Sequence, residues 1–223
     1  MSSIVEIWRY PVKSMAGERL DSCMVTASGL DGDRRWAVVD GAPHRAGKLL
    51  TIKHHDRLLT YRARLAGGAV EVDAPDGAIA MLDEELVRRL EVESSRPLEL
   101  RELPGGNFDD SHLLIVNLAS VAVLGLEAGM NVDHRRFRAN LYVDGIEPEE
   151  EAGWVGARIR AGDAELEVTG RCERCVVITK DPDTTEAAPE LLRLLAERHD
   201  ASMGVYCQVL RPGRVAVGDH VGY

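Results

Sequence analysis

Short strand-like segments separated by turns recur along most of this chain of 223 residues, and they constrain its fold more than any other feature. Residues 3–12 alternate apolar and polar side chains, and residues 34–40 form an apolar segment after a turn rich in Gly and Asp. Three further segments are typical of β-hairpins around glycine-containing turns, at residues 58–77, 157–170 and 207–221. Strands at this spacing favour a β-barrel or a strongly bent sheet.

Helical periodicity is confined to three short segments, at residues 82–93, 118–129 and 186–200. The first repeats leucine every four residues, the second ends at a glycine, and the third has Pro189 in its first turn. The predicted fold is therefore mainly β, of the α+β type, with a few short helices. A composition shift at Pro104–Gly106 predicts a boundary between residues 1–105 and 106–223.

Composition and charge narrow the classes of protein and partner. The formal net charge is −10, which argues against nucleic acid or an anionic membrane as a partner of the whole surface. No uncharged apolar run is long enough to span a bilayer, and the N-terminus lacks the pattern of a signal peptide. We therefore expect a soluble, cytoplasmic protein without a membrane span.

Two of the four cysteines, Cys172 and Cys175, form a CxxC pair. A structural zinc site needs further ligands, and the chain has no second CxxC pair and no histidine at metal-type spacing. The β-branched residues 176–179 follow Cys175 directly and predict a strand, whereas a thioredoxin-type pair begins a helix. Two interpretations remain: a single functional thiolate favoured by the flanking Arg171 and Arg174, or two small core residues.

Basic and polar residues recur in three other motifs, as Lys13 with Ser14, Arg34 with Arg35, and Arg138 with Asn140. A loop that offers an ammonium and a hydroxyl suits an oxyanion. In a strand, alternation would point one of the adjacent arginines inward, where it needs an anionic partner, and would place Arg138 and Asn140 on the same side. Sequence spacing leaves two alternatives open: solvated surface charges, or convergence on one anionic ligand.

Taken in order, five motifs resemble the MOSC family, the molybdenum-cofactor-binding domains named after the C-terminal part of molybdenum cofactor sulfurase. The motifs are YPVKS, GLDGDRRWAVVD, RFRANLYVDG, CERC with DPDT, and VGDHV. The resemblance covers nearly the whole chain and is strongest to the group that contains the mitochondrial amidoxime reducing component and its bacterial relatives. It implies a MOSC-type β-barrel core preceded by an N-terminal β-barrel-like region.

The resemblance also implies a site for the molybdenum cofactor, a Mo-pyranopterin. The second cysteine of the family's CxRC pattern binds molybdenum, which makes Cys175 the implied metal ligand and catalytic residue. The residues implied to bind the cofactor are Lys13, Ser14, Arg34, Ser111, Arg138, Asn140 and Cys175. Asp110 and the segment LTIKHHDRL depart from the family pattern, the latter around Lys53 to Arg57.

By resemblance, the chain is a molybdenum-dependent oxidoreductase that reduces N-hydroxylated small molecules such as amidoximes and hydroxylamines, or carries out a related oxygen-atom transfer. No iron–sulfur or haem motif is present, and we expect a separate reductase as electron donor. Asp183 is a candidate proton relay. The alternatives are a cofactor carrier or persulfide sulfur-transfer module, without the pyridoxal-phosphate-dependent desulfurase domain found in some relatives, and a β-barrel binding or structural protein.

Overall fold

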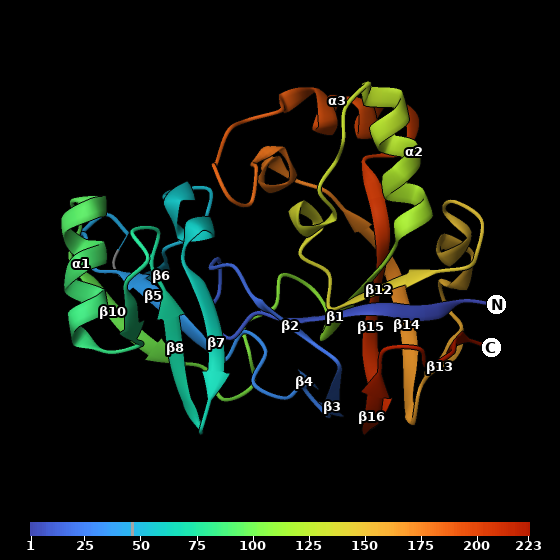
Figure 1. Cartoon of the computed structure of the whole chain (residues 1–223), viewed down its shortest axis with the longest axis horizontal. Coiled ribbons are helices and arrows are strands. Elements are labelled where there is room, and N and C mark those ends of the chain that lie inside the picture. Colours follow the sequence, from blue (N-terminus) through green and yellow to red (C-terminus); the bar gives the residue numbers. More distant parts are fainter. Residues whose placement is uncertain (46) are drawn as a thin grey trace.

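The computed structural model describes residues 1–45 and 47–223. An eight-stranded sheet forms its large lobe, and it is antiparallel except for the parallel pair of β11 and β12. In spatial order its strands are β17 (Val221–Gly222), β13 (Arg158–Ala161), β14 (Ala164–Glu173), β15 (Ser202–Arg211), β11 (Leu113–Asn117), β12 (Leu141–Asp144), β1 (Ser3–Arg9) and β2 (Glu18–Leu20). This sheet curls into a half-barrel (Figure 1).

Three smaller sheets complete the strand structure of the described residues. One closes the half-barrel and contains β16 (Gly213–Ala216), β3 (Ser22–Thr26) and β4 (Gly29–Leu30). The other two belong to a small lobe and contain β10 (Leu98–Glu102), β5 (Trp36–Asp40) and β6 (Lys48–Leu49), and β7 (Arg62–Ala66), β8 (Ala69–Asp73) and β9 (Ile79–Met81).

The helices are short, and most lie between strands. They are η1 (Asp56–Thr60), α1 (Glu84–Ser94), α2 (Leu118–Ala128), η2 (His134–Phe137), η3 (Glu150–Trp154), η4 (Val176–Thr179) and α3 (Pro189–Arg198), where η denotes a 3-10 helix. The Asp83 side chain caps α1 by accepting from two backbone N–H groups, and the Asn117 side chain caps α2 by accepting from one, that of Ala119. Gly129 ends α2 in the left-handed conformation, as the sequence predicted.

Alternation along the strands of the large sheet builds two hydrophobic cores. In β11, Leu113 and Ile115 face the interior of the half-barrel, whereas Leu114 and Val116 face α2 and α3. Figure 1 shows both helices over one side of this sheet. A third core fills the small lobe, where apolar side chains of α1 pack on those of β5, β7 and β8. The candidate site described below draws its residues from both lobes.

The fold class is confirmed: the chain is mainly β, with a curled sheet and three short α-helices among the described residues. The helices predicted at 82–93, 118–129 and 186–200 are α1, α2 and α3. The hairpins predicted around Gly67–Gly68 and Gly162–Asp163 are β7–β8 and β13–β14. No helix in the described residues is long and apolar enough to cross a membrane.

Two predicted elements are wrong. Residues 207–221 form no hairpin, because β16 leaves β15 and pairs with β3. Residues 176–179 form the 3-10 helix η4 in place of a strand, and Cys175 precedes it as the N-cap. Within this β-branched segment Ile178 is buried in the core of the large lobe, whereas Val176 is exposed. Tertiary packing therefore overrides the local strand propensity of residues 176–179.

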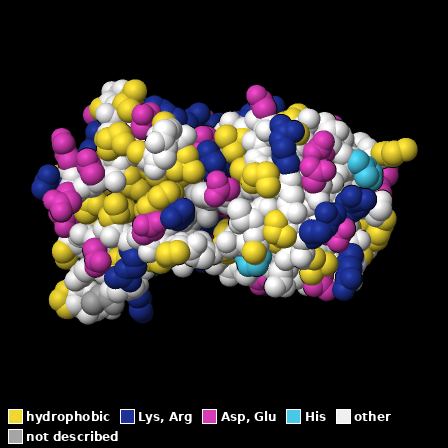
Figure 2. All heavy atoms as spheres, turned by 90° about the horizontal axis from the view of Figure 1, so that it is seen from below, with side chains coloured by type: hydrophobic (Ala, Val, Ile, Leu, Met, Phe, Trp, Pro, Cys, Tyr) yellow, Lys and Arg dark blue, Asp and Glu magenta, His cyan; other side chains and the backbone are white. Residues whose placement is uncertain are grey.

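Charged side chains of both signs are mixed on the face shown in Figure 2, where Lys and Arg lie among Asp and Glu. Several of the basic residues singled out in the sequence form ion pairs, including Arg35 with Glu102 and Arg171 with Asp200. These two arginines are solvated surface charges.

Candidate functional site

A cavity of about 500 Å³ receives residues from both lobes and contains every residue predicted from the sequence to bind the cofactor or the metal. Its lining includes Lys13, Ser14, Arg34, Ser111, Arg138, Asn140 and Cys175. Five separate parts of the chain supply them: the loop after β1, the turn before β5, the segment before β11, the residues around η2, and the segment before η4. The sequence motifs that lie far apart along the chain therefore meet in space.

Six basic side chains line this cavity: Lys13, Arg34, Lys53, Arg136, Arg138 and Arg174. The three that were predicted from the sequence, Lys13, Arg34 and Arg138, have different partners. The Lys13 Nζ is 2.7 Å from the Asp109 carboxylate, whose side chain is exposed. Arg34 pairs with the fully buried Asp33. Arg138 donates to the Met15 carbonyl at 2.8 Å and forms no ion pair within residues 1–45 and 47–223. An uncompensated buried cation is costly, so the cavity is suited to an anionic ligand.

Two of these cations, Arg34 and Arg138, lie over the ring of Tyr10. The Arg34 and Arg138 guanidinium carbons lie 4.9 and 4.5 Å from its centre. Burial lowers the pKa of Arg138, and the neighbouring Arg34 lowers it further. Burial also lowers the pKa of Lys13, while Asp109 opposes that shift. Burial lowers the pKa of Arg34, but Asp33 more than offsets this, so its net shift is upward.

Backbone strain is concentrated at the same place. Ser14, Arg34 and Arg138 all have positive φ angles, of 72°, 51° and 53°. Residues other than glycine adopt this left-handed region at a cost, and such residues cluster at functional sites. The conformation explains a difference from the sequence analysis: Arg34 and Arg35 diverge because of a turn, since β5 begins only at Trp36.

Asn140 supports the cations from behind. Its amide nitrogen donates to Asp33 at 3.0 Å and to the Trp8 carbonyl at 3.2 Å, while its oxygen accepts from the Leu114 N–H at 3.3 Å. The prediction that Arg138 and Asn140 share one side of a strand is wrong, because Arg138 is the left-handed cap of η2 and β12 begins after Asn140. Both nevertheless line the cavity.

The two CxxC cysteines are unequal. Cys175 is exposed at the N-cap of η4, whereas Cys172 is buried within β14, and both line the cavity as free thiols. Burial raises the pKa of Cys172. The flanking arginines are occupied elsewhere: Arg174 donates to the Met203 and Phe137 carbonyls, and Arg171 pairs with Asp200. Gly170 gives no close backbone approach within the protein, since a Cβ there would meet nothing within 4 Å.

Ser111 lines the cavity, and its hydroxyl is 3.0 Å from that of Thr169. Asp183, the candidate proton relay, is not among the lining residues and pairs with Arg135 instead. The sequence analysis missed Asp33 and Asp109, the carboxylates that hold Arg34 and Lys13. Asp33 lies inside a motif that the analysis used, GLDGDRRW, but only the arginines of that motif drew attention.

The donors present in the cavity fit a molybdenum–pterin cofactor. The basic side chains of the lining suit its anionic phosphate, and a single accessible thiol is a soft ligand for molybdenum. Among the described residues, no group of three or more His, Cys, Asp or Glu side chains is placed to hold a metal ion.

Comparison with protein families matches the whole chain. Residues 77–222 match the model of the MOSC domain, and residues 1–97 match that of the MOSC N-terminal beta barrel domain. In structure, the chain is similar to the YuaD protein from Bacillus subtilis, with a TM-score of 0.56 at 18% identity over 99% of this chain and 94% of that one. At this identity the likeness concerns the fold alone.

Curated relatives fall into two groups. The molybdenum cofactor sulfurase of Drosophila mojavensis is 28% identical over 249 residues, which cover 91% of this chain but only 31% of the sulfurase. The mitochondrial amidoxime-reducing component 1 of Homo sapiens is 24% identical over 284 residues, which cover 99% of this chain and 82% of that protein. The chain thus spans about a third of the sulfurase and most of the amidoxime-reducing component.

Proposed function

The chain belongs to the MOSC domain family, and from this premise we propose that it is a molybdenum-dependent oxidoreductase that reduces N-hydroxylated compounds. A function related to the molybdenum cofactor is supported by the family and by both groups of relatives. The reaction and the substrate class follow the human relative, an amidoxime-reducing component matched over nearly all of this chain. Amidoximes and hydroxylamines are the proposed substrates.

One observation carries the proposal: six basic side chains, Lys13, Arg34 and Arg138 among them, and a single exposed cysteine line the same cavity. In the proposed roles, Lys13, Arg34 and Arg138 bind the anionic end of the cofactor. Ser14 and Ser111 donate or accept at its polar edge, and Asn140 orients Arg34 through Asp33. Cys175 is the proposed molybdenum ligand. The complete set of proposed site residues is Lys13, Ser14, Arg34, Ser111, Arg138, Asn140 and Cys175.

Reduction of a hydroxylamine breaks the N–O bond, releases water and consumes electrons and protons. When bound, the molybdenum cofactor would supply the electron transfer and the oxygen-atom transfer that no side chain can perform. The protein supplies a thiolate ligand, neutralises the phosphate and keeps the anionic end of the ligand away from bulk water. We propose that a separate reductase delivers the electrons and that the protein works in the cytoplasm.

The decisive experiment measures molybdenum and pterin in protein purified from a host that makes the cofactor. We expect bound molybdenum in the wild type and its loss in Cys175→Ser. The matched control is Cys23→Ser, since Cys23 is a partly exposed thiol that does not line the cavity. Retention of molybdenum by Cys175→Ser, or a metal-free wild type, would overturn the proposal.

A second assay addresses the substrate. Reduction of benzamidoxime by loaded protein with a chemical electron donor should be lost together with molybdenum in Cys175→Ser and kept in Cys23→Ser. The second candidate function is a cofactor carrier or persulfide sulfur-transfer module, favoured by the match to the sulfurases over 91% of this chain. Loaded protein without N-reductive activity, carrying one added sulfur on the Cys172–Cys175 peptide by mass spectrometry, would favour that candidate.

A further inference from the structure

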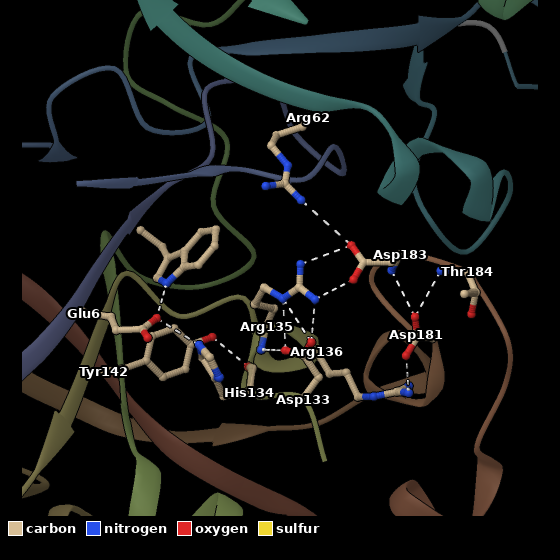
Figure 3. Close-up of polar contacts among 11 residues, drawn as sticks. Glu6, Arg62, Asp133, His134, Arg135, Arg136, Tyr142, Asp181, Asp183 and Thr184 are labelled. Carbon is tan, nitrogen blue, oxygen red and sulfur yellow. Dashed lines mark hydrogen bonds and ion pairs between the residues drawn. The ribbon is translucent and has the colours of Figure 1, made fainter. Parts of the chain in front are cut away.

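The 3-10 helix η2 carries arginines that point to different places. Figure 3 shows Arg135 directed to Asp183 and Arg136 directed to Asp181. Arg138, the C-cap of the same helix, lines the cavity. The sequence motif DHRRFR therefore contacts the motif DPDT in space, and it also supplies two basic side chains of the cavity, Arg136 and Arg138.

Arg136 is the most buried of these side chains, with 6% of its surface exposed. Its Nη1 donates to the Thr179 carbonyl, at the end of η4, at 3.0 Å. Its Nη2 donates to the Asp181 carboxylate at 2.9 Å. The other oxygen of Asp181 accepts from the backbone N–H groups of Asp183 and Thr184, both at 3.0 Å. One guanidinium thus holds the end of η4 and the turn that follows it.

The opposite flank of Cys175 is tied to the same helix. Arg174 donates to the Phe137 carbonyl of η2 at 3.0 Å, and its guanidinium carbon lies 5.1 Å from the centre of the Phe137 ring. The segment that carries Cys175 is therefore attached to η2 on both sides, by Arg174 before the cysteine and by Arg136 after η4.

The helix η2 is itself fixed to the large sheet. The His134 ring is 2.9 Å from the Glu6 carboxylate of β1, and the Tyr142 hydroxyl of β12 donates to the His134 carbonyl at 2.7 Å (Figure 3). The Asp133 side chain caps the start of the helix. Because η2 is anchored, contacts to it transmit a fixed position to the thiol of Cys175 and to the guanidinium of Arg138.

We propose that Arg136 is a positioning residue that sets the place of the Cys175 thiol relative to the cations of the cavity. A ligand held at one end by Arg138 and at the other by Cys175 needs a defined span between them, and Arg136 connects the two through one rigid helix. This inference rests on the proposed function for its ligand, but its geometric part concerns the protein alone. Residues that orient a metal ligand affect metal affinity strongly without touching the metal.

The first arm of the test measures the mobility of Cys175 without cofactor. The whole chain is produced in a host that cannot make molybdopterin, carries Cys23→Ser, and is labelled with a nitroxide at Cys175, since Cys172 and Cys207 are buried. In Arg136→Gln we expect a nitroxide correlation time shorter by at least about twofold, because a locally opened segment moves more freely. In the control Arg135→Gln we expect the wild-type line shape, because Arg135 reaches this turn only at the exposed Asp183, whereas Arg136 also holds the Thr179 carbonyl at the end of η4.

The second arm measures molybdenum per chain in protein from a cofactor-competent host. We expect Arg136→Gln to lose about tenfold or more, the range typical of residues that orient metal ligands, and Arg135→Gln to stay within about twofold of wild type. Arg136→Lys should be intermediate, because an ammonium can keep the contact to Asp181 but cannot also reach Thr179 as a planar fork does. Asp181→Asn tests the same contact from its other side if Arg136→Gln does not fold.

The outcomes separate the two proposals. Wild-type mobility and molybdenum content in both Arg136→Gln and Asp181→Asn would overturn the positioning role, as would equal effects of Arg135→Gln. A wild type without molybdenum would overturn the proposed function, and the nitroxide result would then still decide whether Arg136 positions Cys175. Increased mobility and molybdenum loss confined to the Arg136 and Asp181 variants would establish it.

Discussion

At the scale of single residues, Arg34 and Arg138 differ although both are half-buried over the ring of Tyr10. Arg34 neutralises Asp33, a carboxylate with no exposed surface that also accepts from the Tyr10 N–H at 2.7 Å. Arg138 has no carboxylate partner in the described residues, and burial lowers its pKa. Arg34 is thus part of the folded structure's own charge balance, whereas Arg138 has no carboxylate to neutralise it in the described part of the chain and is the residue proposed to bind the anionic end of the cofactor.

We therefore predict that two similar substitutions change the free energy of unfolding by very different amounts. Arg34→Gln should lower the free energy of unfolding of the cofactor-free protein by about 3–5 kcal/mol, because it leaves Asp33 buried without its cation. Arg138→Gln should stay within about 1 kcal/mol of wild type, because the lost hydrogen bond to Met15 is offset by removal of an unpaired buried charge. Urea unfolding of both variants, prepared without cofactor, measures the difference.

Molybdenum content completes this comparison. Arg138→Gln should fold like wild type yet retain little molybdenum, which would assign its charge to the ligand. If Arg138→Gln proved as unstable as Arg34→Gln, the charge of Arg138 would stabilise the folded protein itself. Arg138 would then no longer indicate an anionic ligand in the cavity.

At the scale of elements, His199 joins three helices of the large lobe. It follows α3, its Nε2 is 2.7 Å from the Glu127 carboxylate of α2, and its Nδ1 contacts Glu149, the N-cap of η3. Burial lowers the pKa of His199, but the two carboxylates more than offset this and raise it above its usual value of 6.5. The folded protein therefore favours the protonated ring, which can donate to both carboxylates.

This contact makes stability depend on pH. Because the folded-state pKa is raised, the contribution of His199 is fully present below the unfolded value of 6.5 and is lost as pH rises through the folded value. His199→Gln should lower the free energy of unfolding by about 1–3 kcal/mol near pH 6, since two charge-assisted hydrogen bonds are lost. The difference from wild type should shrink at about pH 9.

Urea unfolding at several pH values measures this difference directly, and His44→Gln is the control, because His44 is exposed and outside the contact. A difference between wild type and His199→Gln that stayed constant with pH would show that His199 acts through packing and not through its charge.

Local patterns were sufficient for the elements whose partners are adjacent in sequence. The leucine repeat in α1 and the glycine turns of β7–β8 and β13–β14 predicted those elements correctly. They failed for η4 and for β16, because the conformation of each is decided by distant contacts, with the core of the large lobe and with β3. The candidate site shows the same division: motifs identified its cations and thiol, but the left-handed backbone of Ser14, Arg34 and Arg138 has no local cue.

At the scale of the whole molecule, the N-terminal segment is shared between the lobes. Strand β1 pairs with β12 and β3 pairs with β16, so residues before the small lobe belong to sheets of the large lobe. The boundary placed at residues 105 and 106 stays a prediction. The lobes also meet beside the candidate site, where Lys180, after η4, lies 2.7 Å from Asp56 of η1, and Asp183 lies 3.8 Å from Arg62 of β7.

The Lys180–Asp56 pair should couple the two lobes electrostatically. The hydrogen bond from Lys180 lowers the pKa of Asp56. Because both side chains are partly exposed, we expect a coupling free energy of about 0.5–1 kcal/mol, from a cycle of Lys180→Asp, Asp56→Lys and the double exchange in urea unfolding. Each single variant places like charges together, and the exchanged pair should recover most of the lost stability.

Ionic strength separates this electrostatic coupling from packing. Raising salt to about 1 M shortens the screening length to about 3 Å and should remove most of the coupling. The Arg211–Glu165 pair is a matched control, since it lies within the large sheet and is more exposed, so its cycle should give a smaller coupling. If no Lys180–Asp56 coupling were measured at low salt, β1, β3 and the residues that line the shared cavity would hold the lobes together without this ion pair. A coupling that survives high salt would place the contribution in the packing of η1 against the segment after η4.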